Sequence, residues 1–292
     1  MKRARQEARP YNIDVSKLTS VQREELRRKS KSIPLVADKE PLEIVFEDDR
    51  FLAVNKPSYV KMHPSHRFEG GSLLNRAIGH CGFTPWLLHR LDMHTTGVVL
   101  FAKKKKLCHP IMRQFMAGRV EKEYLCVVDG YSPEARDTTF AIDAPIQRHT
   151  ISFVREVGSS GKDSKPAKTV YTILDKSSEK KMMLLRAAPQ TGRTHQIRVH
   201  AKECSLPIVG DDLYNEKEFN MYASYDEISA AAHKPELTRF GDKNPLRKGL
   251  KLHAWKITLR DPESNERISF CAPPPGHMQD LLEWSGLSLP EQ

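Results

Sequence analysis

The hydrophobic positions from residue 41 onward fall in short apolar runs that are typical of β-strands. The segment LEIVFEDDRFLAVNKP holds two such runs, residues 44–46 and 51–54, separated by the polar turn-forming residues 47–50, and this pattern predicts a hairpin. Residues 97–102 (GVVLFA) are continuously apolar, as in a strand that is buried on both faces. Further strands are expected at residues 122–128, 170–174, 182–187, 251–259 and 267–271, and together they predict a mixed sheet.

Helices are predicted at four places between these strands and after them. Residues 72–81 form a short helix that Ser72 caps and Gly82 ends, and residues 106–116 form a second helix that ends at Gly118. A third begins near Thr194, which can cap it, and a fourth covers residues 278–284.

The chain divides into a basic extension, residues 1–40, and one folded domain, residues 41–292. The extension has one plausible helix, residues 20–29, but too little apolar surface for a core, so we expect it to be mobile. A basic arm that adds RNA affinity and a targeting segment are the alternatives. Within the domain, residues 158–166 have the composition of an exposed loop, and the polar, patternless residues 215–248 are expected to be an insertion.

Charge narrows the class of partner. The 292 residues carry a formal net charge of +10 with a pI near 9.3, which favours association with polyanions, so nucleic acid is the first partner to test. The five cysteines are scattered without a CxxC pair or a cluster at zinc spacing, as in a protein with reduced thiols. No apolar run approaches the roughly 20 residues of a membrane span. We expect an intracellular, cytoplasmic protein, with the nucleus or an organelle as alternatives.

Three segments carry the residues most suited to chemistry. In LHRLDMHTTGVVLFAK, a charged loop with Asp92 leads directly into the apolar strand, and Gly97 would permit close approach of a substrate. Taken alone, Asp92 is more often a structural residue that caps a turn. In KEYLCVV, Tyr124 lies on a strand, where an aromatic residue usually belongs to the core.

The third segment, TGRTHQIRVH, concentrates two arginines and two histidines. Thr194 can cap a helix whose first turn would bring Arg198 close to His195. Arg193 and Arg198 would suit anionic partners, and phosphate binding alone would explain the segment.

Read in order, these segments closely resemble the motifs of the RluA-type pseudouridine synthases, which carry HRLDxxTSG, a K-x-Y strand and GRTHQIRVH. Here they are HRLDMHTTG, KEY and GRTHQIRVH. The flanking segments FEDDRFLAVNKPSYVKMHPS, GDDLY, LHAW and FCAPPP also resemble the family, so the similarity covers residues 41 to about 277. The resemblance implies an α+β pseudouridine synthase catalytic fold, a mixed and mainly antiparallel sheet flanked by helices and loops.

The resemblance also implies a function and roles for five residues. Such enzymes isomerise uridine in RNA without a cofactor, and Asp92 would be the catalytic residue. Arg198 would be the opposite charge that keeps Asp92 ionised, and Arg90 would fill the space that the flipped base vacates. Tyr124 would stack on the uracil, and Ile197 would close the apolar side of the pocket. We therefore expect a structured RNA, ribosomal or transfer, as the partner, with no metal and no membrane, and a monomeric enzyme.

Two departures from the family and two alternatives accompany this hypothesis. Thr96 replaces the usual Ser, which keeps the hydroxyl, so we expect activity to survive. Many relatives begin with an S4-type RNA-binding domain, for which residues 1–40 are too short. The first alternative is a catalytically silent RNA-binding protein of the same fold. The second is a hydrolase in which Asp92 pairs with His89 or His94, and it predicts release of the base instead of isomerisation.

Overall fold

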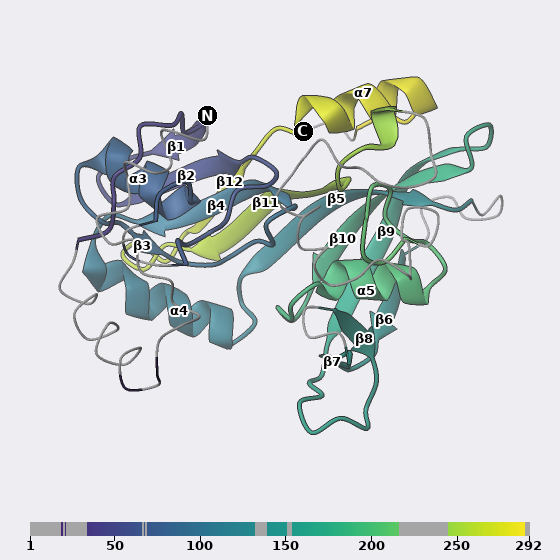
Figure 1. The fold of residues 1–292 in the computed structure, drawn as a ribbon, viewed down its shortest axis with the longest axis horizontal. Coiled ribbons are helices and arrows are strands. Elements are labelled where there is room, and N and C mark those ends of the chain that lie inside the picture. The colour runs from purple at the N-terminus through teal and green to yellow at the C-terminus, as the bar shows by residue number, and fades with distance from the viewer. Residues whose placement is uncertain are drawn as a thin grey trace.

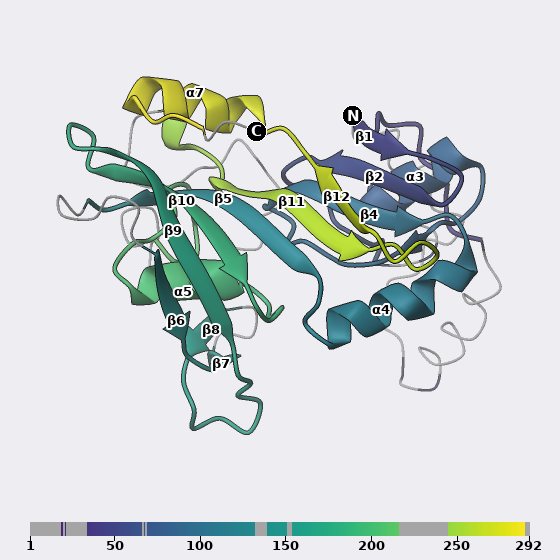
Figure 2. The same ribbon diagram turned by 180° about the vertical axis from the view of Figure 1, so that it is seen from behind.

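The fold is built on one large curved sheet with helices on its faces (Figures 1 and 2). The computed structural model describes residues 19, 21, 34–65, 67, 69–131, 139–150, 154–215 and 245–289. The predicted helix at residues 20–29 and almost all of the predicted insertion lie outside the described residues.

The main sheet has ten strands and is antiparallel except where β4 and β11 run parallel. This confirms the prediction of a mixed, mainly antiparallel sheet. A separate two-stranded sheet pairs β7 (Ile146–Arg148) with β8 (Arg155–Val157). The main order is β1 (Ile44–Glu47), β2 (Phe51–Lys56), β4 (Thr96–Ala102), β11 (Leu252–Arg260), β5 (Glu121–Asp129), β10 (Met182–Pro189), β9 (Lys168–Ser177) and β6 (Thr139–Asp143), with β12 (Arg267–Cys271) paired to β11 and β3 (Trp86–Leu87) paired to β4.

The described helices lie close to the predicted ranges. Helix α3 (Leu73–Cys81) begins after Ser72, whose hydroxyl accepts the amide of Asn75, and it ends at Gly82 in the left-handed conformation, as predicted. A 3-10 turn, η2 (Lys105–Leu107), leads into α4 (Cys108–Met116), and α7 (Gly276–Ser285) covers the predicted terminal helix. The remaining helix, α5 (Gln196–Glu203), follows β10.

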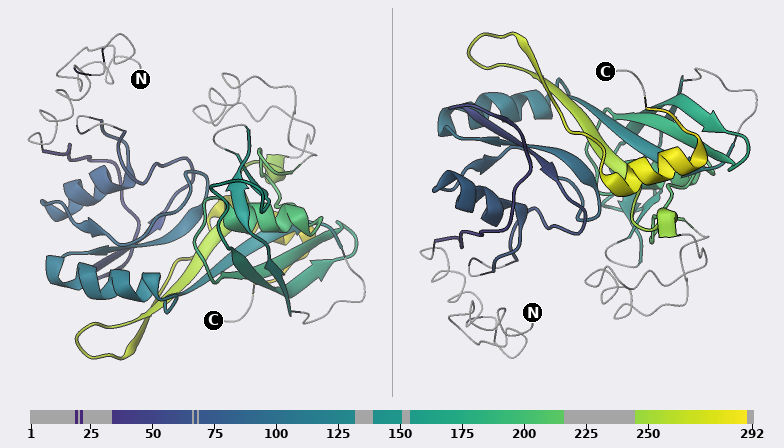
Figure 3. Two further views of the ribbon diagram at one scale, coloured as in Figure 1. Left: turned by 90° about the horizontal axis from the view of Figure 1, so that it is seen from below. Right: turned by 90° about the horizontal axis from the view of Figure 1, so that it is seen from above.

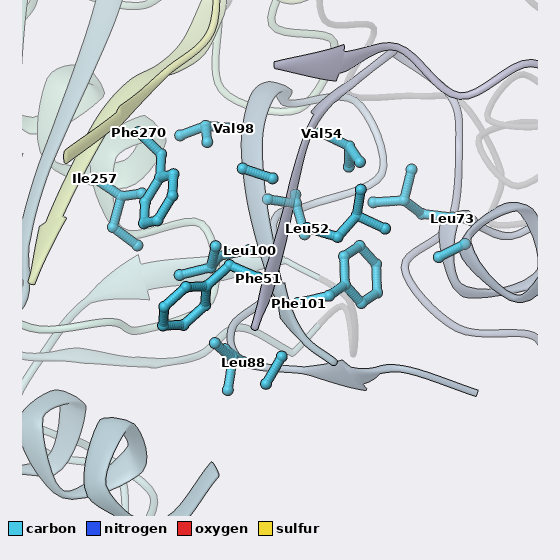
Figure 4. Close-up of a cluster of buried hydrophobic side chains, with 14 of the residues drawn as sticks. Phe51, Leu52, Val54, Leu73, Leu88, Val98, Leu100, Phe101, Ile257 and Phe270 are labelled. Carbon is cyan, nitrogen blue, oxygen red and sulfur yellow. The ribbon is translucent and has the colours of Figure 1, made fainter. Parts of the chain in front are cut away.

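One hydrophobic core fills the half of the molecule built from β1, β2, β4, β12 and α3. Figure 4 shows part of it, with Phe51, Leu100 and Phe270 packed together from three different strands. All seven residues of β4 are buried, which confirms that this strand is covered on both faces. The loop that precedes β4 is therefore attached to a rigid element.

The strands β5 and β10 at the centre of the other half are also covered on both faces. Their alternate residues divide between two cores: Leu125 and Leu184 pack with α7, whereas Cys126 and Leu185 pack with α5. Figure 3 shows α5 and α7 on different sides of these strands. Because side chains alternate along β5, Tyr124 lies on the face that α5 covers.

Candidate functional site

A pocket of about 290 Å³ lies where the two halves of the sheet meet. It is lined by the loop before β4, the start of β5, the inner edge of α4 and the segment that joins β10 to α5. All three segments singled out from the sequence therefore contribute to one site. The five residues with predicted roles line it together: Arg90, Asp92, Tyr124, Ile197 and Arg198.

The loop that carries Asp92 is fastened by a buried lysine. Lys56, at the end of β2, is fully buried, and its Nζ donates to the carbonyls of Pro57, Met93 and Thr95 at 2.8–2.9 Å. These three bonds use all three N–H groups of an ammonium. Burial lowers the pKa of Lys56 to about 7, against the effect of the nearby Asp92 carboxylate. Lys56 thus ties the loop to the hairpin formed by β1 and β2.

The two residues after this loop join it to β11. The Nε2 of His253 faces the carbonyl of Ala272, which can only accept, so Nδ1 is free to accept the hydroxyl of Thr96 at 2.9 Å. The substitution of Thr for Ser at position 96 therefore keeps a buried hydrogen bond. Gly97 has φ +115°, and a Cβ there would lie 2.2 Å from the carbonyl oxygen of Ala254. The expectation that Gly97 makes room for substrate was wrong, because the close neighbour is the backbone of β11.

Asp92 is partly buried, with 23% of its side chain exposed. Burial raises its pKa above the ordinary value, while Arg198, Arg90 and His94 act in the opposite direction. Arg198 thus lowers the pKa of Asp92, as expected, but the desolvation of the carboxylate raises this pKa by more. Among the described residues, the basic side chain within 4.0 Å of the Asp92 carboxylate is the imidazole of His195, whose Nε2 lies 3.9 Å from Oδ2.

Arg198 forms its ion pair with a different carboxylate. Its Nε and Nη2 donate to the two oxygens of Asp211 at 2.8 and 2.7 Å, and both side chains are almost fully buried. Asp211 also accepts the backbone amides of Leu213 and Tyr214. The expected direct pair between Arg198 and Asp92 is therefore replaced by a buried fork between Arg198 and Asp211, which also removes Arg198 from the groups available to phosphate.

Helix α5 begins differently from the prediction. Its N-cap is His195, which has a left-handed backbone (φ 58°) and makes no capping bond with its side chain, so the prediction that Thr194 caps the helix was wrong. The side chain of Gln196 orders the preceding turn instead. It accepts the Thr191 hydroxyl at 2.6 Å and the Arg193 amide at 3.0 Å. A left-handed backbone at a residue other than glycine is strained, and such strain is often found at functional sites.

His195 is linked to Tyr214 in a short chain of hydrogen bonds. The Tyr214 hydroxyl accepts the backbone amide of Arg155 at 2.8 Å and lies 2.8 Å from Nδ1 of His195. The hydroxyl can donate its own proton to Nδ1, and in that arrangement the proton of the imidazole lies on Nε2, the atom that faces Asp92. Burial, followed by the field of Arg198, lowers the pKa of His195 to about 2, so the ring is neutral.

The remaining pocket residues supply an aromatic face, an apolar wall and cations. Tyr124 is half-buried, and burial together with the Asp92 carboxylate raises the pKa of its phenol, which keeps it neutral. Ile197 is buried on α5, whereas Arg90 is exposed. Lys122 donates to the carbonyl of Thr191 at 2.9 Å, and burial lowers its pKa to about 8. The pocket thus combines a carboxylate, a flat aromatic ring and positive charge.

Three residues that shape this site had no role in the prediction: Lys56, Asp211 and Tyr214. Each lies in a segment already recognised from its resemblance to the family, NKP or GDDLY. The described part of the chain contains no group of three or more His, Cys, Asp or Glu side chains placed to hold a metal ion. In the same residues, no helix is long and apolar enough to cross a membrane.

The pocket brings an acidic residue, a flat aromatic ring and positive charge together on an α+β fold, and comparison with known proteins identifies the family. Residues 50–203 match the family described as RNA pseudouridylate synthase. The chain therefore belongs to the RNA pseudouridylate synthase family, in agreement with its RluA-type motifs.

Two curated relatives are similar over most of this chain. The ribosomal large subunit pseudouridine synthase D of Nitrosomonas europaea is 32% identical over 248 residues, which cover 83% of this chain and 65% of the relative. The ribosomal large subunit pseudouridine synthase C of Vibrio cholerae is 32% identical over 241 residues, 82% of this chain and 68% of the relative. The chain thus spans about two thirds of the length of these relatives.

Solved structures share the fold. Human RNA pseudouridylate synthase domain containing 1 matches with a TM-score of 0.61 and 25% identity, over 82% of this chain and 86% of that one. Human RNA pseudouridylate synthase domain containing 4 matches with a TM-score of 0.62 over 94% of this chain and 100% of that one, at 22% identity. These matches confirm the predicted α+β pseudouridine synthase fold.

Proposed function

We propose that this protein isomerises specific uridines in structured RNA to pseudouridine and that Asp92 is the catalytic residue. The observation that carries the proposal is the position of Asp92: it lies in a pocket, on a loop fastened by Lys56, beside Tyr124 and within the positive field of Arg198. Membership of the RNA pseudouridylate synthase family gives the reaction class. The geometry of the pocket supports the choice of the residues that would carry it.

The reaction breaks the bond between C1′ and N1, turns the uracil and joins C1′ to C5, so it needs no cofactor. An ionised carboxylate can attack C1′ or the base, or take a proton from C2′, and Asp92 can do any of these once it is charged. Arg198 and Arg90 favour that charged form. Tyr124 offers a neutral ring on which the uracil can stack, and Ile197 offers an apolar wall.

The exposed guanidinium of Arg90 is suited to the space that the uridine leaves in the RNA. It lies on the same loop as Asp92, two residues away, and at the pocket. A planar guanidinium can stack between bases and also bond phosphates. This contact would offset part of the few kcal/mol of free energy needed to flip a base from its stack.

Ribosomal RNA is the substrate class we propose first, because the two relatives described above are named for the large ribosomal subunit. Transfer RNA is the second class. The net charge of +10 suits either one. We propose that the enzyme acts as a monomer without a metal ion.

A pseudouridine map of total RNA from cells that lack the protein tests the proposal. Wild-type protein added back should restore the lost positions, and Asp92→Ala should restore none. A matched control is Asp212→Ala, which removes a nearby carboxylate that is 48% exposed, and it should restore most of the modification. If no position is lost in the first place, or if Asp92→Ala restores them, the proposal fails. An RNA-binding protein without turnover would give the first of these results.

A further inference from the structure

The outer face of α4 carries exposed apolar side chains at the edge of the pocket. Met112 is 42% exposed and lines the pocket, and Met116, one turn further along the helix, is 84% exposed. Phe115, on the same helix, also lines the pocket. Methionine is over-represented at adaptable binding surfaces, and its thioether makes favourable contacts with flat aromatic rings.

The segment around α4 is also strongly basic. Between Met93 and Val120 the sequence contains no Asp or Glu. The basic residues at the start of this segment are partly neutralised, since Lys103 pairs with Glu47 and Lys106 with Glu263. The positive charge nearest in sequence to the exposed methionines comes from residues further along the segment.

Arg113 and Arg119 supply this charge. Both are exposed, and within the described part of the chain neither forms an ion pair. Arg113 follows Met112 on the helix, and Arg119 comes directly after the turn at Gly118. The methionines are thus flanked by cations on the side of α4 away from the core.

We propose that this face of α4, formed by Met112, Arg113, Met116 and Arg119, binds the RNA strand that flanks the nucleotide in the pocket. The methionines contact one flanking base, and the arginines contact phosphates. The proposal rests on the proposed function, since it requires that the pocket takes a nucleotide from an RNA chain.

Two observations favour RNA over a protein partner on this face. The face continues into the pocket through Met112 and Phe115, so a nucleotide in the pocket brings its neighbours in the strand close to α4. The charge is of one sign, which suits a phosphate backbone. A partner protein bound there would instead cover the entrance of the pocket.

Binding of a defined probe tests the proposal. The probe is a fluorescein-labelled ten-nucleotide single-stranded RNA with one central uridine, and a second probe has abasic riboses on both sides of that uridine. The protein is the full chain with Asp92→Asn, so that the probe is not altered, and affinity is measured by fluorescence anisotropy at several salt concentrations.

The double variant Met112→Ser/Met116→Ser should bind the first probe about tenfold more weakly, with an unchanged salt dependence. On the abasic probe the same variant should bind as the parent protein does. The double variant Arg113→Gln/Arg119→Gln should instead lower the slope of log affinity against log salt by about 1.4, which corresponds to two lost phosphate contacts on a single strand. The two variants of this face should therefore change two different quantities, the affinity for the first probe and the salt dependence of binding.

Matched controls lie elsewhere on the molecule. Trp284→Ser removes an apolar side chain that is 40% exposed, close to the value for Met112, from α7. This helix packs on the other face of β5 from the pocket, so the variant should leave binding unchanged. Lys39→Gln removes an exposed cation and should leave the affinity for the probe within about twofold of the parent.

Failure of the inference can be told apart from failure of the proposed function. If wild-type protein forms pseudouridine in RNA but both double variants bind the probe like the parent, the α4 face is not an RNA surface. If the methionine variant changes the oligomeric state in size-exclusion chromatography and not the affinity, the face binds a second copy of the chain and the proposal is overturned. If both double variants change binding as expected but the wild-type protein forms no pseudouridine, the α4 face is an RNA surface and the proposed enzymatic function fails.

Discussion

Removal of the Tyr214 hydroxyl tests how the pocket sets the pKa of Asp92. Tyr214→Phe keeps the ring, which is 3% exposed and packs under the guanidinium of Arg198 at 5.0 Å, and removes only the oxygen. His195 then loses the donor to its Nδ1, and the amide of Arg155 loses its acceptor. The imidazole is free to place its proton on Nδ1, which turns a lone pair of Nε2 toward the Asp92 carboxylate.

The magnitude follows from the bonds that are lost. Each buried hydrogen bond contributes about 0.5–1.5 kcal/mol, so Tyr214→Phe should lower the free energy of unfolding by about 1–3 kcal/mol. The change at Asp92 is electrostatic: a neutral donor at 3.9 Å is exchanged for a lone pair. We therefore expect the apparent pKa of Asp92 to rise further in this variant, because the donor that faces the carboxylate is lost.

Other groups face the same carboxylate and stay in place in this variant. They are Arg90 and His94 on its own loop, Arg198 and Asp211 from the α5 region, Lys56 from β2 and Tyr124 from β5. A change in the pH profile then reports on His195. Since the proposed mechanism needs a charged Asp92, a higher pKa should lower kcat/KM more at pH 6 than at pH 8.

The assay is a pH profile of kcat/KM for pseudouridine formation, measured together with urea unfolding. Tyr171→Phe is the matched control, because Tyr171 is fully buried and donates one bond, at 2.8 Å, to the carbonyl of Ile197. Tyr171→Phe should lower the free energy of unfolding by about 1 kcal/mol and leave the acid limb of the pH profile where it is in wild type. If the acid limb of Tyr214→Phe coincides with that of wild type, or if Tyr171→Phe moves it equally, the assigned role of His195 and Tyr214 is refuted.

Three further variants test the framework of the site by urea unfolding. Gly97→Ala should lower the free energy of unfolding by more than about 3 kcal/mol because its Cβ meets the β11 backbone. Gly82→Ala has open space around its Cβ and should cost about 1–2 kcal/mol from backbone strain alone. Equal losses in the two variants would contradict the steric role of Gly97. Asp211→Asn should cost about 3–5 kcal/mol because it breaks a buried ion pair, and the exposed Asp212→Asn should cost less than about 1 kcal/mol; a small effect at Asp211 would show that the fork is unimportant. Lys56→Met should cost about 3 kcal/mol and reduce kcat, since three buried carbonyls lose their donor; normal kcat in a folded variant would refute the role of this clamp.

Much of the fold could be predicted because local patterns determine it. The ends of α3 follow from Ser72 and Gly82, and the continuous apolar run that follows Thr96 is fully buried in β4. Strands β5, β9 and β10 extend one to three residues beyond their predicted ends. Element boundaries depend on pairing with neighbours, which a single run of residues does not reveal.

The elements that were missed are short and weakly patterned. β3 has two residues and β7 and β8 have three each, and β6 is largely exposed. Such strands form because a neighbouring strand offers unpaired backbone groups, and that information is not local.

The candidate site shows the same division between local and distant information. The resemblance to the family identified the segments that carry Asp92, Tyr124 and Arg198, and the structure brings them into one pocket. Sequence spacing did not predict that Arg198 would pair with Asp211 or that burial would raise the pKa of Asp92. Both depend on contacts between segments that are separate in the chain, where geometry decides the outcome.

Release of tritium from uridine labelled at C5 is the most direct test of the central claim. Isomerisation replaces the C5–H bond by a bond to C1′, so each pseudouridine formed in labelled RNA releases one tritium to water. The substrate is RNA labelled with [5-³H]uridine in cells that lack the protein. Wild-type protein should release tritium without free uracil, and Asp92→Asn should do so at least about 1,000-fold more slowly. Labelled free uracil would indicate a hydrolase, and an undiminished rate with Asp92→Asn would contradict the assignment of Asp92 as the catalytic residue.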